Sequence, residues 1–414
     1  MGADWEPYIV RSVTGRMPFF MVLAVACLCA CPVMAQSDLS TGDPARSIYR
    51  SQANDAENKP SAWPLQLEMR VPFDPTAFPN GLNSYLLYEL YLTNFAQTPV
   101  SLSRIEVLDA GAAGGPPIGS FDATQLETMV QSFSAKTGAN PKEKLTLSPG
   151  QSVIVFISVA VERKSHLPSR LIHRVIAGDS IGQGAEISTN HTALHVLGPP
   201  VAGANWLAAD GPSNDEDNHH RRGVILLGGK TVDSRRYAID WKRIQDGVSF
   251  SGDARDVHSY YSYGQTVLAV ADGRVLAARD RLPDNIPGHG EAFHPAVPIT
   301  FETVAGNTIT LDLGGGQFAY YMHLAPGSLQ VKAGDRVRRG QVLAHIGASG
   351  DAREPHLHFE VTTSSTILAG EGVPYLIDHF RTQSEGEAQP GIHNNELPLG
   401  KSVVNLGAEP ANGR

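Results

Sequence analysis

Two histidines, His356 and His358, are separated by one residue in the apolar stretch from Pro355 to Phe359. Side chains two positions apart on a strand point to the same face, so both imidazoles are expected on one side of a sheet. Neutral imidazole is the commonest metal ligand in proteins, and it also transfers protons near neutral pH. A pair of hydrogen-bonded histidines at a strand end would show the same pattern, so a metal site here requires further ligands elsewhere in the chain.

A carboxylate, Asp240, lies in a second apolar stretch. An ionised carboxylate is costly to bury alone, so Asp240 needs a metal or hydrogen-bond donors. The glycines at 228–229 predict a hairpin centred near Lys230, which would place His220 directly opposite Asp240 with Cβ atoms about 4.5–5.5 Å apart. A register shift of one residue would present His219 instead, so His219 stays open as the alternative.

A further histidine, His323, closes an apolar and aromatic stretch that follows three glycines at 314–316. A histidine in such a place is more often a buried, hydrogen-bonded residue than a catalytic one, so its role depends on its neighbours. Glu360 follows the His-x-His stretch, and we expect it to point away from His358 and to be structural. The chain has no His-Glu-x-x-His sequence, so a glutamate base on a helix is not available.

The composition describes a globular protein that does not bind nucleic acid. The chain has 414 residues, which is enough for two or three domains with their own cores. Hydrophobic residues make up 42% and charged residues 18%, values that exclude a disordered chain. The net charge is -9 and no basic stripe occurs, whereas nucleic-acid binders usually carry a basic surface.

The N-terminal segment predicts export. Two arginines precede an apolar run over residues 17–31, and small residues stand before a cleavage point after Ala35, which is the layout of a secretory signal peptide over residues 1–35. The run is shorter than the roughly 20 residues of a membrane-spanning helix, so no transmembrane segment is expected in the mature chain. Lipid attachment at Cys31 is the alternative. The only cysteines lie in this segment, at Cys27, Cys29 and Cys31. Cleavage after Ala35 leaves histidine and carboxylate as the available metal ligands.

The rest of the chain predicts an all-β protein. Residues 36–60 are polar and read as a linker. Residues 61–200 contain short alternating strands that indicate an antiparallel, sandwich-like accessory domain, with strands expected at 86–92, 100–108 and 152–159. Residues 201–380 form a second, mainly β domain. Residues 381–414 form a tail that we expect to be extended or partly loose.

Turn residues in the second domain predict two further hairpins. Asp272-Gly273 separates two apolar runs, a strong signal for a two-residue hairpin. The glycines at 314–316 separate residues 307–313 from 317–323 in the same way. The second hairpin would deliver His323 to the end of its returning strand.

Six stretches of residues 205–380, in this order, resemble the zinc peptidase domain of the lysostaphin and LytM type, the M23 peptidase family. They are Ile239-Asp240, the segments 267–275, 321–324, 334–343 and 346–350, and Pro355 to Phe359. The resemblance implies a mainly antiparallel β fold, one zinc ion held by a histidine, Asp240 and His358, and catalytic roles for His323 and His356. It also implies endopeptidase action on the peptide cross-links of bacterial peptidoglycan.

One position departs from the family pattern. The family places its first ligand four residues before the aspartate, where this chain has Arg236. The expected first ligand is therefore His220, from the segment before Arg221. A zinc-bound water would attack the scissile carbonyl, with His356 and His323 sharing the proton transfer and oxyanion stabilisation.

Three functions are compatible with these patterns. The first is an exported zinc endopeptidase, periplasmic or associated with the cell envelope, that hydrolyses peptidoglycan. The second is a catalytically inactive LytM-type protein that binds or activates cell-wall hydrolases. The third is a surface interaction protein that acts mainly through residues 63–197, where a protein partner or the wall could dock. All five candidate positions hold residue types that can bind a metal or transfer a proton, which favours the first function, the zinc endopeptidase.

Overall fold

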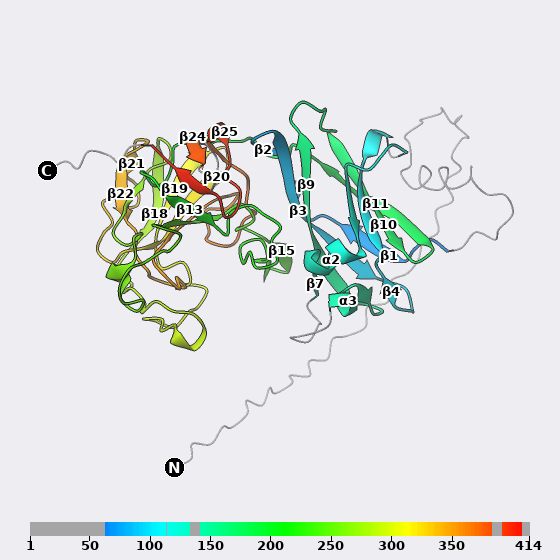
Figure 1. Cartoon of the computed structure of the whole chain (residues 1–414), viewed down its shortest axis with the longest axis horizontal. Helices are drawn as coiled ribbons and strands as arrows, with labels where there is room; N and C mark the ends of the chain where they lie inside the picture. The colour runs from blue at the N-terminus through cyan, green and yellow to red at the C-terminus, as the bar shows by residue number, and fades with distance from the viewer. Residues whose placement is uncertain (1–62, 113, 133–140, 383–390, 408–414) are drawn as a thin grey trace, which may run out of the picture. The chain divides into compact units, whose positions relative to one another are not determined.

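The computed structural model describes residues 63–112, 114–132, 141–382 and 391–407 (Figure 1). The predicted signal peptide, linker and cysteines all lie outside these residues. Nearly every regular element is a β-strand, which confirms the predicted all-β class. No helix in the described ranges is long and apolar enough to cross a lipid bilayer.

Two antiparallel sheets in the first part of the described chain face each other as a sandwich. One contains β1 (Leu67–Arg70), β2 (Phe78–Asn80), β3 (Asn83–Asn94), β7 (Val130–Ser132) and β9 (Ser152–Glu162). The other contains β5 (Arg104–Asp109), β6 (Gly119–Asp122), β10 (Arg170–Ala177) and β11 (Ser180–Ser188). Side chains from both sheets, such as Leu90, Val155 and Val175, fill one core. The long strands β3 and β9 run side by side in Figure 1 and pair along eleven positions, from Asn83 with Glu162 to Thr93 with Ser152.

Short elements complete the sandwich. The stretch predicted as one strand over 100–108 is divided, because β4 (Val100–Ser101) pairs with β8 (Thr146–Leu147) whereas β5 pairs with β6 and β10. The helices are η1 (Ala110–Ala112), α2 (Ala123–Met129) and α3 (Pro141–Lys144). Asp122 begins α2, since its side chain accepts the Gln125 N–H while the Gln125 side chain accepts the Asp122 N–H.

An eleven-stranded sheet carries three of the five candidate functional residues, Asp240, His323 and His358. Its strands are β12 (Val196–Leu197), β13 (Trp206–Ala209), β16 (Ile239–Arg243), β18 (Gly273–Arg279), β19 (Asn307–Gly314), β20 (Gln317–Leu324), β21 (Arg336–Val337), β23 (Leu357–Thr362), β24 (Leu376–Thr382), β25 (Gly391–Glu396) and β26 (Val403–Asn405). Outside it lie the pairs β14 (Ile225–Leu227) with β15 (Lys230–Val232) and β17 (Thr266–Leu268) with β22 (Val342–His345), and the 3-10 turns η2 (Val257–Ser259) and η3 (Gly290–Ala292). Trp206, Trp241 and Phe359 are fully buried in its core.

The middle of this sheet positions the site. Strand β23 lies between β16 and β20, so Asp240 pairs with His358 on one side and Met322 pairs with His358 on the other. The predicted hairpin around the glycines at 314–316 is confirmed by the pairing of β19 with β20. His323 directly follows Met322 and therefore ends beside the same part of β23.

The hairpin predicted near Lys230 is wrong in its register and extent. Strands β14 and β15 pair Leu227 with Lys230 and end at Val232, so Asp240 is not part of this hairpin. Asp240 instead pairs with Ala209 of β13 and with His358 of β23. Buried polar residues between Val232 and β16 interrupt the strand, which is why the simple count from the turn fails.

The hairpin predicted at Asp272-Gly273 is also wrong. Strand β17 pairs with β22, whereas β18 pairs with β19 and β21. The dipeptide therefore connects two sheets. The chain does not reverse there, because the residues on both sides of the dipeptide run antiparallel to the same returning segment, from Thr266 opposite His345 to Arg274 opposite Arg336.

The chain after Phe380 is more regular than expected. Strand β25 pairs with β24, and β26 bridges β24 and β13. The expected loose tail is therefore wrong for these two strands. From Trp63 onward the chain forms one compact unit, and the core of the large sheet also includes Phe78 and Leu87 of the sandwich. The division near residue 200 stays a prediction.

Candidate metal centre

Three histidine rings converge on one buried carboxylate. Asp240 is 3% exposed. Its Oδ1 atom lies 2.9 Å from His358 Nδ1 and 3.3 Å from His220 Nε2. Its Oδ2 atom lies 3.3 Å from His356 Nε2. The structure therefore brings together four of the five residues proposed from the sequence, although they come from three separate segments.

The strand β23 presents its polar side chains on one face, as its alternation predicts. His356 immediately precedes β23 and His358 lies on it, and both face Asp240. Glu360 shares this face, because it is two residues further along, and its Oε2 atom lies 3.3 Å from His358 Nε2. The expectation that Glu360 points away is wrong. Residues two positions apart on a strand share a face, and this rule places Glu360 on the same face as His356 and His358.

His220 reaches Asp240 from a turn and not from a strand. The turn closes when Asn218 Oδ1 accepts the Arg221 N–H and the His220 carbonyl accepts the Gly223 N–H, at 2.9 Å each. The His220 Nδ1 atom lies 3.0 Å from the Asp210 carbonyl oxygen. A carbonyl can only accept, so Nδ1 carries the proton and Nε2 presents a lone pair toward Asp240. The predicted neighbour is thus correct, and the predicted strand pairing is not.

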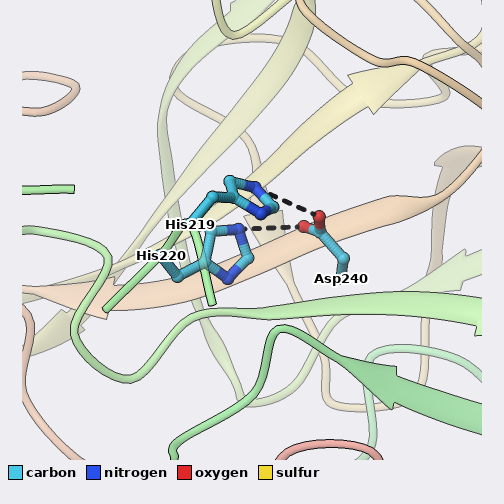
Figure 2. Close-up of side chains that lie close together, drawn as sticks. All are labelled: His219, His220 and Asp240. Atoms are coloured by element: carbon cyan, nitrogen blue, oxygen red, sulfur yellow. Dashed lines mark ion pairs between the residues drawn. The ribbon is translucent and has the colours of Figure 1, made fainter. Parts of the chain in front are cut away.

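His219 also approaches the carboxylate. One ligand atom from each of His219, His220 and Asp240 lies within 4.8 Å of the other two. Figure 2 shows both rings on the same side of Asp240, each directed at one of its oxygens. His219 Nε2 is 3.8 Å from Asp240 Oδ2, and its side chain is 56% exposed. A strand would place His219 on the opposite face from His220, but consecutive residues of a turn need not alternate.

His323 completes the group through an unusual backbone conformation. Two residues, Met322 and His323, stand opposite Thr308, so β20 has a bulge here. The φ angle of His323 is 63°, in the left-handed region that such bulges favour. Its Nδ1 atom lies 2.9 Å from the Ser349 carbonyl oxygen, and its ring centroid lies 4.8 Å from that of His356. The bulge turns this ring toward the histidine pair.

The donor set fits a divalent zinc ion. Buried His220 Nε2 has no well-formed hydrogen bond within the described residues. If His358 donates its Nε2–H to Glu360, then His358 Nδ1 and His220 Nε2 both direct lone pairs at Asp240 Oδ1, an arrangement that a bound cation would stabilise. Ligands held at 2.0–2.1 Å in a tetrahedral arrangement lie about 3.3 Å apart, close to the observed spacing.

Burial and neighbouring charges set the protonation of the group. Burial favours the neutral form of Asp240, but the His356 and His220 rings outweigh it and hold the pKa of Asp240 well below its usual value. Burial lowers the pKa of His220 to about 4, against the opposing charge of Asp240. Burial and the neighbouring rings also hold the pKa of His323 well below its usual value. Both histidines are therefore neutral, as ligands and bases must be.

The pKa of His358 shifts in the opposite direction to those of His220 and His323. Burial opposes its charged form, but hydrogen bonds to Asp240 and Glu360 raise the pKa of His358 to about 9. Such a ring must release its second proton when it binds a metal.

A second polar group orients His356 and was missed from the sequence. His356 Nδ1 lies 2.8 Å from the Glu354 carbonyl oxygen, so in the neutral ring the proton is on Nδ1 and the unprotonated Nε2 faces Asp240 Oδ2. The Glu354 carboxylate is held by Lys242 Nζ at 2.8 Å and by the Ser249 hydroxyl at 2.7 Å. Lys242 lies two residues after Asp240 on β16, so strand alternation could have indicated this group.

Residues 255–369 match Peptidase family M23. The matched segment contains His323, His356 and His358 and begins after His220 and Asp240. The chain is similar to the glycyl-glycine endopeptidase ALE-1 of Staphylococcus capitis, with 30% identity over 128 residues, 30% of this chain and 29% of that protein. It is also similar to the peptidoglycan DD-endopeptidase ShyB of Vibrio cholerae, with 33% identity over 98 residues, 24% of this chain and 18% of that protein.

Other matches are equally partial. The cell division protein DipM of Caulobacter vibrioides is 30% identical over 122 residues, 29% of this chain and 16% of that protein. The alignments to these three relatives span less than a third of each. Among solved structures, the catalytic domain of lysostaphin from Staphylococcus simulans matches 36% of this chain and 80% of that chain, with 23% identity and a TM-score of 0.20.

Proposed function

Because residues 255–369 form a Peptidase family M23 domain, we propose that this chain is an exported, zinc-dependent endopeptidase that hydrolyses the peptide cross-links of bacterial peptidoglycan. The observation that carries the proposal is the convergence of His220, His356 and His358 on buried Asp240. Two similar proteins are named a glycyl-glycine endopeptidase and a peptidoglycan DD-endopeptidase, which favours a wall peptide as the substrate.

We assign His220, Asp240 and His358 as the residues that would hold the ion. Their candidate ligand atoms are all buried, and two of the three approach the same carboxylate oxygen. Zinc bound there would lower the pKa of a water molecule toward about 7 and polarise the scissile carbonyl. His219 is left out because its ring is exposed and lies further from Asp240.

His356 and His323 take different parts in the proton transfer. Each donates its Nδ1–H to a backbone carbonyl and so keeps Nε2 free as a base. A proton accepted at His356 Nε2 would lie 3.3 Å from Asp240 Oδ2, which stabilises the imidazolium until the proton passes to the leaving amine. His323 stays neutral through burial, which suits a ring that accepts a hydrogen bond from the attacking water and orients it.

Export would bring the enzyme to peptidoglycan, its proposed substrate. The predicted signal peptide over residues 1–35, or a lipid at Cys31, would deliver the chain to the periplasm or the cell envelope, where peptidoglycan lies. The net charge of -9 gives no electrostatic reason to expect a nucleic-acid partner.

Digestion of purified peptidoglycan tests the proposal. Mass spectrometry of the muropeptides should show cross-linked dimers converted to monomers by the zinc-loaded chain, and no conversion by the chelated chain or by His358→Ala. The masses of the products identify the bond that is cleaved. A folded wild-type chain that converts no wall preparation would instead favour the inactive, binding or activating protein.

A further inference from the structure

One carboxylate of the sandwich joins the two segments that deliver His220 and Asp240. Glu89 lies on β3, is 3% exposed, and forms buried ion pairs with Arg221 and Arg236. Arg221 directly follows His220. Arg236 lies four residues before Asp240, at the position where the family pattern has a ligand.

The two arginines bind Glu89 in complementary ways. Arg236 donates from Nε to both carboxylate oxygens, at 3.1 and 3.0 Å, and from Nη2 to Oε2 at 2.5 Å. Arg221 donates from Nη1 to Oε1. Arg236 is 4% exposed and Arg221 is fully buried. Charge-assisted, multiply bonded pairs of this kind fix geometry as well as charge.

Further contacts fasten the same two segments to the sandwich. Arg221 Nη2 donates to the carbonyl oxygens of Tyr88 and Ile157, at 2.8 and 3.1 Å. The Tyr237 hydroxyl donates to the Leu87 carbonyl oxygen at 3.0 Å. Thus β3 and β9 hold the turn that carries His220, and β3 also holds the approach to β16.

The His220 turn depends on this anchor more than the other ligands do. Asp240 and His358 lie on paired strands inside the large sheet, where the ladder fixes them. His220 lies outside any strand, and its Nε2 atom makes no well-formed hydrogen bond within the described part of the chain. The backbone on its C-terminal side is held by Arg221, whose charged end is neutralised by Glu89. A shift of that arginine would move His220 directly.

We propose that Glu89 is a positioning residue for the metal centre, which sets the distance between His220 and Asp240 through Arg221 and Arg236. This inference rests on the proposed zinc site. The sandwich is then a structural part of the metal centre and not a detachable wall-binding module. Direct hydrogen-bond partners of metal ligands are typically worth on the order of 10- to 100-fold in metal affinity, and Glu89, which acts through Arg221 and Arg236, is expected at the lower end of that range.

A control variant at a second ion pair distinguishes positioning of the metal centre from general stabilisation of the fold. Glu396 of β25 is also buried and also binds the sandwich, through Arg163 Nη1 at 2.6 Å and the Gly81 N–H at 2.7 Å. Within the described residues, the Glu396 carboxylate contacts Arg163, the Gly81 N–H and His393, and none of these belongs to the His220 turn. Glu396→Gln therefore removes a buried carboxylate charge that binds the sandwich away from the site, with an arginine partner that is 44% exposed where the partners of Glu89 are buried.

The experiment measures zinc affinity of the full chain by competition with a chromophoric chelator, together with the melting temperature. Glu89→Gln should weaken zinc binding on the order of 10-fold, and Glu396→Gln by less than about 3-fold. Equal losses in both variants, or unchanged affinity in folded Glu89→Gln, would overturn the proposal.

A milder variant keeps the test usable if Glu89→Gln does not fold. Arg221→Lys keeps the charge but loses the planar fork that reaches both Glu89 and the backbone carbonyls, so zinc binding should again weaken while Glu396→Gln stays near wild type. Zinc affinity in Arg221→Lys equal to wild type would overturn the proposal. A wild-type chain that binds zinc tightly but cleaves no peptidoglycan would overturn the proposed function alone.

Discussion

His220 Nε2 lies 3.3 Å from Asp240 Oδ1, although the two residues share no strand pairing. The contact is made by a tight turn after β13 that directs the ring at the start of β16. Two consecutive histidines of this turn, His219 and His220, approach the carboxylate, so the first metal ligand must be chosen between them.

Replacement of each histidine in turn distinguishes them. His220→Ala should lower zinc affinity by at least about 100-fold, because a buried, pre-oriented ligand is lost. His219→Ala should change it by less than about 10-fold, since that ring is exposed and lies 3.8 Å from Asp240 Oδ2. Chelator competition on the two variants is the measurement. A larger loss in His219→Ala would reverse the assignment of the first ligand.

The proposed catalytic histidines should be separable from the ligands. His356→Ala and His323→Ala are each expected to retain one zinc per chain, because neither is assigned as a ligand, and to lose about 10²- to 10⁴-fold in peptidoglycan hydrolysis. Metal content by atomic spectroscopy and muropeptide release are measured on the same samples. Loss of zinc from either variant would instead make that residue a ligand.

Local periodicity explains which parts of the site were predictable. His356 and His358 followed from strand alternation, and His323 from a glycine turn whose two strands do pair. The same alternation places Glu360 on the face of His358, where the expectation that it points away is wrong. The position of His220 could not be counted from a hairpin, because buried polar residues after Val232 end the strand. Tertiary contacts, and not local pattern, decide such positions.

The fold, like the site, has parts that local sequence patterns predict and parts that depend on tertiary contacts. The alternating strands of the sandwich and the all-β class followed from residue patterns that each element satisfies by itself. The partners of β17, β18 and β26 did not, because each depends on residues distant in sequence. Glu89 has no local signal at all. It lies within a buried strand and is explained only by the two arginines that reach it.

We expect Glu360 to increase the zinc affinity of the site through its contact with His358. Its Oε2 atom lies 3.3 Å from His358 Nε2, where it orients the ring and increases its basicity. Glu360→Gln keeps an acceptor but removes the charge, so zinc affinity should fall by about 10-fold, at the low end for such partners. Glu396→Gln is the control for loss of a buried carboxylate. No difference in affinity between the two variants would show that Glu360 is only structural, as its sequence position first suggested.

Acid should destabilise the sandwich through His173. This ring is fully buried between the Tyr88 hydroxyl and the Ala185 carbonyl, and burial lowers its pKa to about 4 from 6.5. Because the unfolded chain binds the proton first, stability falls as pH drops from about 6.5 toward 4, by roughly 2 kcal/mol at pH 5. Urea unfolding at pH 7.5 and 5 measures the change, and His173→Gln should remove that part of it. Exposed His166→Gln should leave the pH dependence intact, and an equal effect of both variants would contradict the assignment to His173.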